Sequence, residues 1–325
     1  MSKYPEFDLS RLKTQPIAER YSKVKVEDFA KPPLAGRSFA EFLSALPNIL
    51  SGPDIARIAE SIVNARKKEK AVVVAIGGHV VKTGCAPVLI ELMRTGCVTA
   101  MAGNGAVGIH DSEIALFGTT SEDVVAGLRT GEFGMARETA EFYNSTIQEG
   151  VSQGMGIGEA LGRRLEESLA PHRDKSLLAS AWRYGVPFTL HISIGSDIMH
   201  FHPNADGAAL GEGSLRDFRI LAAHMANLAH GGVLLNLGSA VVLPEVLLKA
   251  VAILRNQLGD GFSDFLGVNF DFIQHYRSNQ QVVSRVKSIG GDGIALTGHH
   301  EILIPLLGQA IVDIMEMNGG EMDSE

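Results

Sequence analysis

The sequence has little cysteine and no long apolar run, and both shortages narrow what the protein can be. Cys85 and Cys97 are its two cysteines in 325 residues, too few for a disulfide framework and typical of a reducing compartment. No uninterrupted apolar stretch approaches the length that spans a bilayer, and Met1–Glu6 lacks the apolar core of a signal peptide. We therefore expect a cytoplasmic protein with no membrane partner.

Positive charge is also scarce. The chain carries 29 Lys and Arg against 37 Asp and Glu, giving a formal net charge of −8, and it has no concentrated basic patch. This balance argues against a nucleic-acid partner. Hydrophobic residues make up 45% and charged residues 20%, which is the ordinary composition of a globular enzyme with a small-molecule substrate.

Short apolar runs alternate with helical patterns from residue 71 onward. The expected strands are 71–76, 98–102, 187–194, 232–237, 265–270 and 293–297. Helices are expected at 54–68, 87–94, 121–128, 136–148, 157–169, 175–184, 214–229, 244–257, 279–288 and 302–317. Apolar strands separated by helices predict an α/β fold with a doubly wound, mostly parallel, Rossmann-like sheet. We assign residues 51–325 to one such domain, and residues 1–50, punctuated by five prolines, to an N-terminal arm that wraps the body or a neighbouring subunit.

Three glycines follow the second predicted strand with the G-x-G-x-x-G spacing of dinucleotide-binding proteins. Gly103, Gly105 and Gly108 would let a turn approach phosphate groups, and the helix after them would be capped by Asp111 or Ser112. Glu122 and Asp123 are candidates for a ribose contact. In a chain with 36 glycines the same spacing also fits a tight turn that binds nothing.

Unusual residues gather where the predicted strands end, which is where open α/β sheets bind ligands. They include Gly78-His79, Gly195 to His202, Gly238-Ser239, Asn269 to Asp271, and Gly298 to Glu301. His200 and His202, with His299, His300, Glu301 or Asp271, could hold a metal ion for hydrolysis; alternatively, one histidine contacts substrate and the other is structural.

Sequence position alone indicates structural roles, not catalytic ones, for Lys287 and Trp182. A lysine at a helix C-terminus is most often a solvated charge, and becomes a nucleophile only when desolvated or placed beside another cation. Trp182, the single tryptophan, is expected to pack a helix end onto the sheet.

The ordered motifs between residues 70 and 312 resemble deoxyhypusine synthase. The segments that carry this resemblance are 77–84, 101–113, 182–188, 193–202, 237–243, 269–272 and 284–287. Members of that family are homotetrameric NAD-binding enzymes that move an aminobutyl group through a lysine imine. The resemblance implies Lys287 as the imine-forming lysine, His202 as a substrate contact or general acid/base, and NAD as cofactor. It also places Gly78, His79, Thr83, Gly103, Gly105, Gly108, Asp111, Gly195 and Asp271 at the cofactor.

The resemblance further places Trp182, Gln274, Gln281 and Arg285 at the substrate. Gln274 and Gln281 stand where the family has acidic groups for its cationic amine, and Arg285 stands where it has a tryptophan. A pocket without carboxylates disfavours a dication, so the substrate is not expected to be spermidine. The sequence thus predicts an NAD-dependent transferase or oxidoreductase, homo-oligomeric by resemblance, that acts on an amine or carbonyl compound. A metal-dependent hydrolase and a nucleotide-binding protein without catalysis remain as alternatives.

Overall fold

Six parallel strands form one sheet in the order β3-β2-β1-β4-β5-β6 in the computed structural model, which describes residues 2–317. The strands are β1 (Val72–Ile76), β2 (Ala100–Asn104), β3 (Phe188–His191), β4 (Val233–Leu237), β5 (Leu266–Asp271) and β6 (Asp292–Thr297). Every neighbouring pair is parallel, from Val73 beside Ala100 to Asp271 beside Thr297. The predicted doubly wound α/β fold is confirmed, and each of the six strands overlaps its predicted segment.

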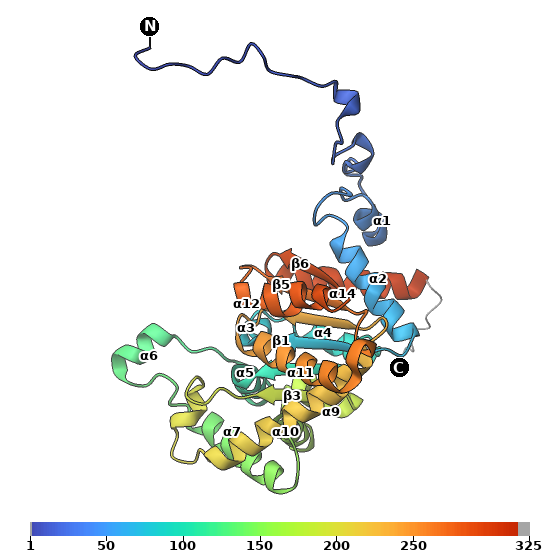
Figure 1. Ribbon diagram of the computed structural model, residues 1–325. Coiled ribbons are helices and arrows are strands. Elements are labelled where there is room, and N and C mark those ends of the chain that lie inside the picture. The colour runs from blue at the N-terminus through green and yellow to red at the C-terminus, as the bar shows by residue number, and fades with distance from the viewer. Residues whose placement is uncertain (1, 318–325) are drawn as a thin grey trace.

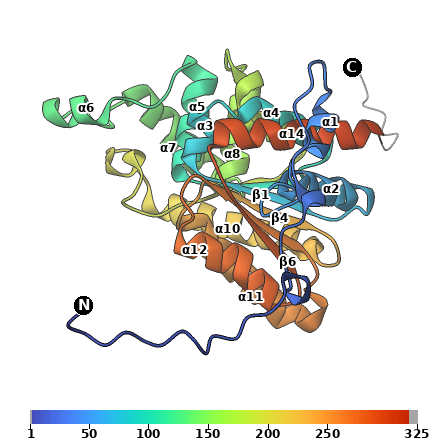
Figure 2. The same cartoon turned by 90° about the horizontal axis from the view of Figure 1, so that it is seen from above.

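Helices cover both faces of this sheet (Figures 1 and 2). The helices on or beside one face are α2 (Asp54–Lys67), α3 (Gly78–Lys82), α4 (Ala86–Arg94), α5 (Gly105–Phe117), α7 (Arg137–Ser152), α8 (Ile157–Glu167), α9 (Leu177–Tyr184) and α14 (His300–Met317). The opposite face carries α10 (Gly207–Met225), α11 (Val242–Leu258) and the segment formed by α12 (Tyr276–Ser278), η7 (Asn279–Ser284) and α13 (Arg285–Ser288).

The two layers are built from alternate residues of the same strands. Val72, Val74 and Ile76 of β1 belong to the first core cluster, whereas Val73 and Ala75 belong to the second. This alternation follows from the period of two in a strand. It explains why the strands appear in the sequence as unbroken apolar runs.

The N-terminal segment contributes little to this core. Residues 2–44 have no buried side chain, and Figure 1 shows the chain before α1 (Phe39–Ser44) leading away from the sheet. The helix α6 (Val124–Thr130) also projects from the body, between α5 and α7. Among residues 2–317, no helix has both the length and the apolar character needed to cross a bilayer.

Several predicted boundaries were wrong. The helix after β2 begins at Gly105 with Asn104 as its cap, because the Asn104 side chain accepts the Val107 backbone N–H at 3.3 Å. Asp111 and Ser112 are therefore buried inside α5 and do not cap it. The helix α10 begins seven residues before the predicted start, at Gly207, and the predicted helix 279–288 is divided into a π-helical segment and α13.

Candidate functional site

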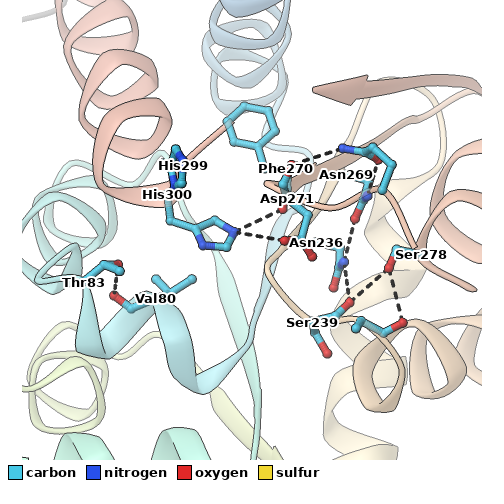
Figure 3. Close-up of polar contacts among 12 residues, drawn as sticks. Val80, Thr83, Asn236, Ser239, Asn269, Phe270, Asp271, Ser278, His299 and His300 are labelled. Atoms are coloured by element: carbon cyan, nitrogen blue, oxygen red, sulfur yellow. Dashed lines mark hydrogen bonds and ion pairs between the residues drawn. The ribbon is translucent and has the colours of Figure 1, made fainter. Parts of the chain in front are cut away.

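The strand order reverses between β1 and β4, and the carboxyl ends of these strands form the candidate site (Figure 3). Gly77 follows β1 and Gly238 follows β4. A Cβ on Gly77 would collide with the Gly238 carbonyl oxygen. Gly238 has φ of +69°, and a Cβ there would lie 2.6 Å from the His300 ring. The two glycines thus allow both turns and the start of α14 to meet at one place.

His300 is the first residue of α14 and is fully buried. Its Nε2 lies 3.4 Å from the Phe270 carbonyl oxygen and 4.0 Å from Asp271 Oδ1. Its Nδ1 has no hydrogen-bond partner among the described residues. Burial lowers the pKa of His300 below its ordinary value, so the ring is neutral near pH 7. With Nε2–H donated to Phe270, Nδ1 is a lone-pair acceptor that can take a proton.

Aromatic rings surround His300. His79 of α3 meets the His300 ring edge-on at a centroid distance of 5.5 Å, and Phe272 lies 5.6 Å from His79 and 5.9 Å from His300. Phe272 also stacks on His299 at 6.0 Å. Phe272 is exposed. This group of rings offers an apolar surface against which a planar ligand can pack.

A network of amides lines the opposite side of the site. Asn236, fully buried in β4, donates to the Ser239 carbonyl at 2.9 Å and to Asn269 Oδ1 at 2.7 Å. Asn269 in turn donates to Gln274, whose amide donates to the Leu296 carbonyl. Asn236 Oδ1 is buried and has no partner within residues 2–317. A buried polar atom left unpaired at a strand end is the position that a ligand donor would fill.

The glycines of the G-x-G-x-x-G motif face protein atoms. A Cβ on Gly105 would collide with the Asp197 carboxylate, and one on Gly103 would lie 2.9 Å from the Val107 side chain. Gly108 faces Leu190 and Tyr143. These glycines therefore serve close packing of α5, and a carboxylate rather than open space lies against its first residue.

Of the other predicted cofactor residues, some lie at the candidate site and others lie elsewhere. His79 and Asp271 lie at the candidate site beside His300, and Gly78 directly follows the Gly77 turn. Thr83 follows α3, with its hydroxyl 3.2 Å from the Val80 carbonyl oxygen (Figure 3). Asp111 is fully buried, where it accepts the backbone N–H groups of Leu177 and Leu178 at 2.7 and 3.0 Å.

Gly195 lies in the exposed loop after β3, and Glu122 and Asp123 lie on the projecting segment around α6. Glu122 accepts the Gly134 N–H, and Asp123 caps α6. None of these three lies beside the β1 and β4 ends.

Lys287 and Trp182 lie at the opposite edge of the sheet. Lys287 is half-exposed, with Nζ 4.0 Å from Asp292, the first residue of β6. Trp182 is near the end of α9 and lines a cavity of about 370 Å³ with Pro187 and Phe188, where β3 begins. Parallel strands share one polarity, so both side chains lie at the amino ends of the strands. The structure does not bring them to the candidate site.

The other predicted substrate residues lie at increasing distance from the candidate site, in the order Gln274, Gln281 and Arg285. Gln274 belongs to the amide network, whereas Gln281 donates to Glu245 and accepts from Arg285. Since the η7–α13 segment runs from the carboxyl toward the amino edge, the distance from the site increases along it.

The histidines proposed as metal ligands have other partners. His200 Nδ1 accepts the Gly195 N–H at 3.0 Å, and His202 Nε2 lies 2.8 Å from the Gly134 carbonyl oxygen. His299 stacks on Phe272 at the start of α14. In the part of the chain that the structure describes, no three His, Cys, Asp or Glu residues are grouped so that they could hold a metal ion.

The residues that sequence reasoning did not single out are Asn236, Phe272, Asp197 and His110. Asn236 could have been found from the sequence, because it is a single polar residue within the apolar run of β4.

The sheet order and the site at its switch point define a Rossmann-like α/β protein. Residues 56–149 match a family model described as arginine dihydrolase ArgZ-like, C-terminal, Rossmann fold. An ornithine cyclodeaminase of Methanothermobacter thermautotrophicus is 35% identical over 66 residues, which cover 20% of this chain and 16% of that protein.

Solved structures show the same fold at low identity. Unliganded AgrE has a TM-score of 0.53 and 19% identity, and AgrE in complex with ornithine and NAD+ has 0.53 and 18%. ArgZ, an arginine dihydrolase from the ornithine-ammonia cycle in cyanobacteria, has 0.51 and 19%. These matches cover 81%, 82% and 82% of this chain, which spans 33% of the length of each of those proteins. A structure assigned provisionally to deoxyhypusine synthase from Entamoeba histolytica has 10% identity and a TM-score of 0.47, too low to carry an argument. The comparisons therefore support the Rossmann-like fold.

Proposed function

We propose that the protein is an NAD-dependent enzyme that transfers a hydride between the cofactor and a small amine or carbonyl compound. One observation carries this proposal: the switch point between β1 and β4 holds two buried polar atoms, His300 Nδ1 and Asn236 Oδ1, that lack protein partners among the described residues. They lie beside the Gly77 and Gly238 turns, which pack closely against each other and against the His300 ring. These features fit a dinucleotide lying across the carboxyl ends of the strands.

The comparisons support the same class of reaction. AgrE was crystallised with ornithine and NAD+, and the curated relative is an ornithine cyclodeaminase. Both names point to a small amino compound, in agreement with the amine expected from the sequence. We therefore propose a small amino acid of the ornithine type as the first substrate to test.

Three side chains would carry the chemistry around the cofactor. When bound, NAD would supply the acceptor for the hydride that leaves the carbon bearing the amine. His300 Nδ1 would take the proton that the amine nitrogen loses, because this nitrogen is unpartnered and the ring is neutral near pH 7. Asp271, 4.0 Å from Nε2, would stabilise the resulting imidazolium. Phe272 offers its exposed ring for stacking against a planar group.

The lysine-imine chemistry of deoxyhypusine synthase is not part of this proposal. Lys287 lies half-exposed at the amino edge of the sheet, beside Asp292. The metal-dependent hydrolase receives no supporting observation from the described residues either, because the predicted ligands have separate partners.

The test combines cofactor binding with turnover. We expect the wild-type protein to bind NADH and to reduce NAD+ in the presence of ornithine or a related amino acid. His300→Gln is expected to lower kcat by about 10²- to 10⁴-fold while the Kd for NADH changes less than about threefold. His275→Gln is the matched control, since His275 is an exposed histidine in the loop after β5.

Two results would reject the proposal. The first is absence of NADH and NADPH binding by folded wild-type protein. The second is full activity of His300→Gln with an identified substrate.

A further inference from the structure

A carboxylate that the mechanism does not use lies at the corner between β2 and α5. Asp197 belongs to the loop after β3, and its side chain is only 9% exposed. It lies directly against the Cα of Gly105, the first residue of α5. Burial raises the pKa of Asp197 above its ordinary value, although His200 and His110 lower it in part. A carboxylate kept in such a place without a protein donor calls for a ligand.

The hydrogen bonds around Asp197 are incomplete. Asp197 Oδ2 and His200 Nε2 are both buried and unpartnered among residues 2–317, and they lie 3.8 Å apart, which is beyond hydrogen-bond distance. His200 Nδ1 accepts the Gly195 N–H, so the proton of the neutral ring is on Nε2 and faces the carboxylate. No described residue donates to Asp197 Oδ1. Asp197 thus faces His200 Nε2 without a hydrogen bond to it and keeps free acceptor capacity.

A second acceptor is held next to this corner. His110 Nδ1 lies 2.7 Å from Thr120 Oγ1, and that hydroxyl donates to Glu113 at 2.5 Å. Burial alone would raise the pKa of Glu113, but hydrogen bonds from His110, Thr120 and Thr139 lower it, so Glu113 is ionised. The single Thr120 proton is used on Glu113, hence His110 donates from Nδ1. The neutral form of the ring then has a lone pair at Nε2. A Cβ on Gly78, in the β1 turn, would lie 3.3 Å from the His110 ring.

The β2 end itself supplies no acidic residue. Dinucleotide-binding folds that use NAD place a carboxylate at the end of the second strand, where it accepts the ribose hydroxyls. Here β2 ends in Gly103-Asn104, and the Asn104 side chain caps α5. The loop after β3 brings the carboxylate of Asp197 to this end instead.

We propose that Asp197 and His110 form a subsite for the adenosine ribose diol and make the protein select NAD over NADP. This inference rests on the proposed function. Both free groups accept hydrogen bonds, so the ligand group that matches them is a pair of hydroxyl donors. A 2′-phosphate would offer no donor and would place its charge against the carboxylate.

The experiment compares the Kd values for NADH and NADPH in wild-type protein and in Asp197→Asn. We expect wild type to prefer NADH by about thirtyfold or more, and Asp197→Asn to reduce this preference by about tenfold or more. Asp206→Asn is the control: it removes the same charge from an exposed residue, and asparagine retains the capping of α10. The control should keep the wild-type preference.

A second measurement needs no variant. In wild-type protein, 5′-AMP should displace NADH about tenfold more effectively than either 2′-deoxy-AMP or 2′,5′-ADP. If NADH binds but wild type does not discriminate against NADPH, or Asp197→Asn leaves the preference unchanged, this inference is wrong and the proposed function stands. If neither dinucleotide binds to wild type, the proposed function itself fails.

Discussion

Asp217 shows how a single buried carboxylate links neighbouring elements. It lies in α10, and its Oδ2 accepts the backbone N–H of Leu190 in β3 at 2.7 Å and of Gly158 in α8 at 3.0 Å. Its Oδ1 is buried, has no partner within the described residues, and lies against Gly156. Burial outweighs these hydrogen bonds and raises the pKa of Asp217 to about 7. The native state therefore favours a protonated carboxyl.

We expect Asp217→Asn to stabilise the protein above neutral pH. From the ordinary pKa of 3.8 up to about 7, native Asp217 keeps a proton that the unfolded chain has lost, so wild-type stability falls as pH rises. This loss amounts to at most about 1.4 kcal/mol per pH unit. In the variant, the amide oxygen can accept both N–H groups and the NH₂ can take the unpartnered position. Urea unfolding across this pH range measures the effect, and parallel pH profiles for the two proteins would contradict it.

At the scale of elements, the same chemical change should have the opposite sign at Asp111. This carboxylate of α5 accepts three donors at the start of α9: Ser176 Oγ at 2.5 Å, Leu177 N at 2.7 Å and Leu178 N at 3.0 Å. Both oxygens are in use, so an amide would turn its NH₂ toward a donor.

Asp111→Asn should lower the free energy of unfolding by about 1–3 kcal/mol, because one buried donor at α9 loses its acceptor. Ser112→Ala is the control, since the neighbouring Ser112 hydroxyl is buried and unpartnered in the described structure. The change in unfolding free energy at neutral pH decides the outcome. Equal stability of Asp111→Asn and wild type would show that the Asp111 carboxylate does not stabilise the start of α9.

Strands β1 to β5 were predictable because each is a run of residues buried on both faces, whereas β6 at the sheet edge has buried and exposed positions. Both patterns depend on local sequence alone. The start of α5 was not predictable in the same way. Asn104, Asp111 and Ser112 are all residue types that cap helices, so the local sequence does not decide between them. In the fold, Asn104 caps α5, and its first residue Gly105 lies against Asp197, 92 positions away in the sequence.

At the scale of the whole molecule, the candidate site was predicted in part. Gly78, His79, Asp271 and Gln274 come together at the switch point because they follow or adjoin parallel strand ends. Lys287 and Trp182 lie at the amino edge instead, because a helix end that precedes a parallel strand lies at that edge. The Asp197 corner required tertiary contacts that no sequence spacing encodes.

The N-terminal arm also belongs to this scale. Ten large apolar side chains between residues 2 and 34 are more than half exposed: Tyr4, Phe7, Leu9, Leu12, Ile17, Tyr21, Val24, Val26, Phe29 and Leu34. Exposed apolar side chains in this number are typical of a segment that packs on another molecule. We therefore predict that the arm binds a second copy of the chain.

Deletion of residues 2–34 should reduce the mass of the assembly in light scattering while circular dichroism and NADH binding are retained, because these residues contribute nothing to the core. A matched variant that replaces Phe7, Tyr21 and Phe29 by serine keeps the chain length and should show the same loss of assembly. Since association follows mass action, the thermal midpoint of the full chain should rise with protein concentration, and that of the truncated chain should not. If the 325-residue chain is monomeric at micromolar concentration, the arm does not bind a second copy of the chain.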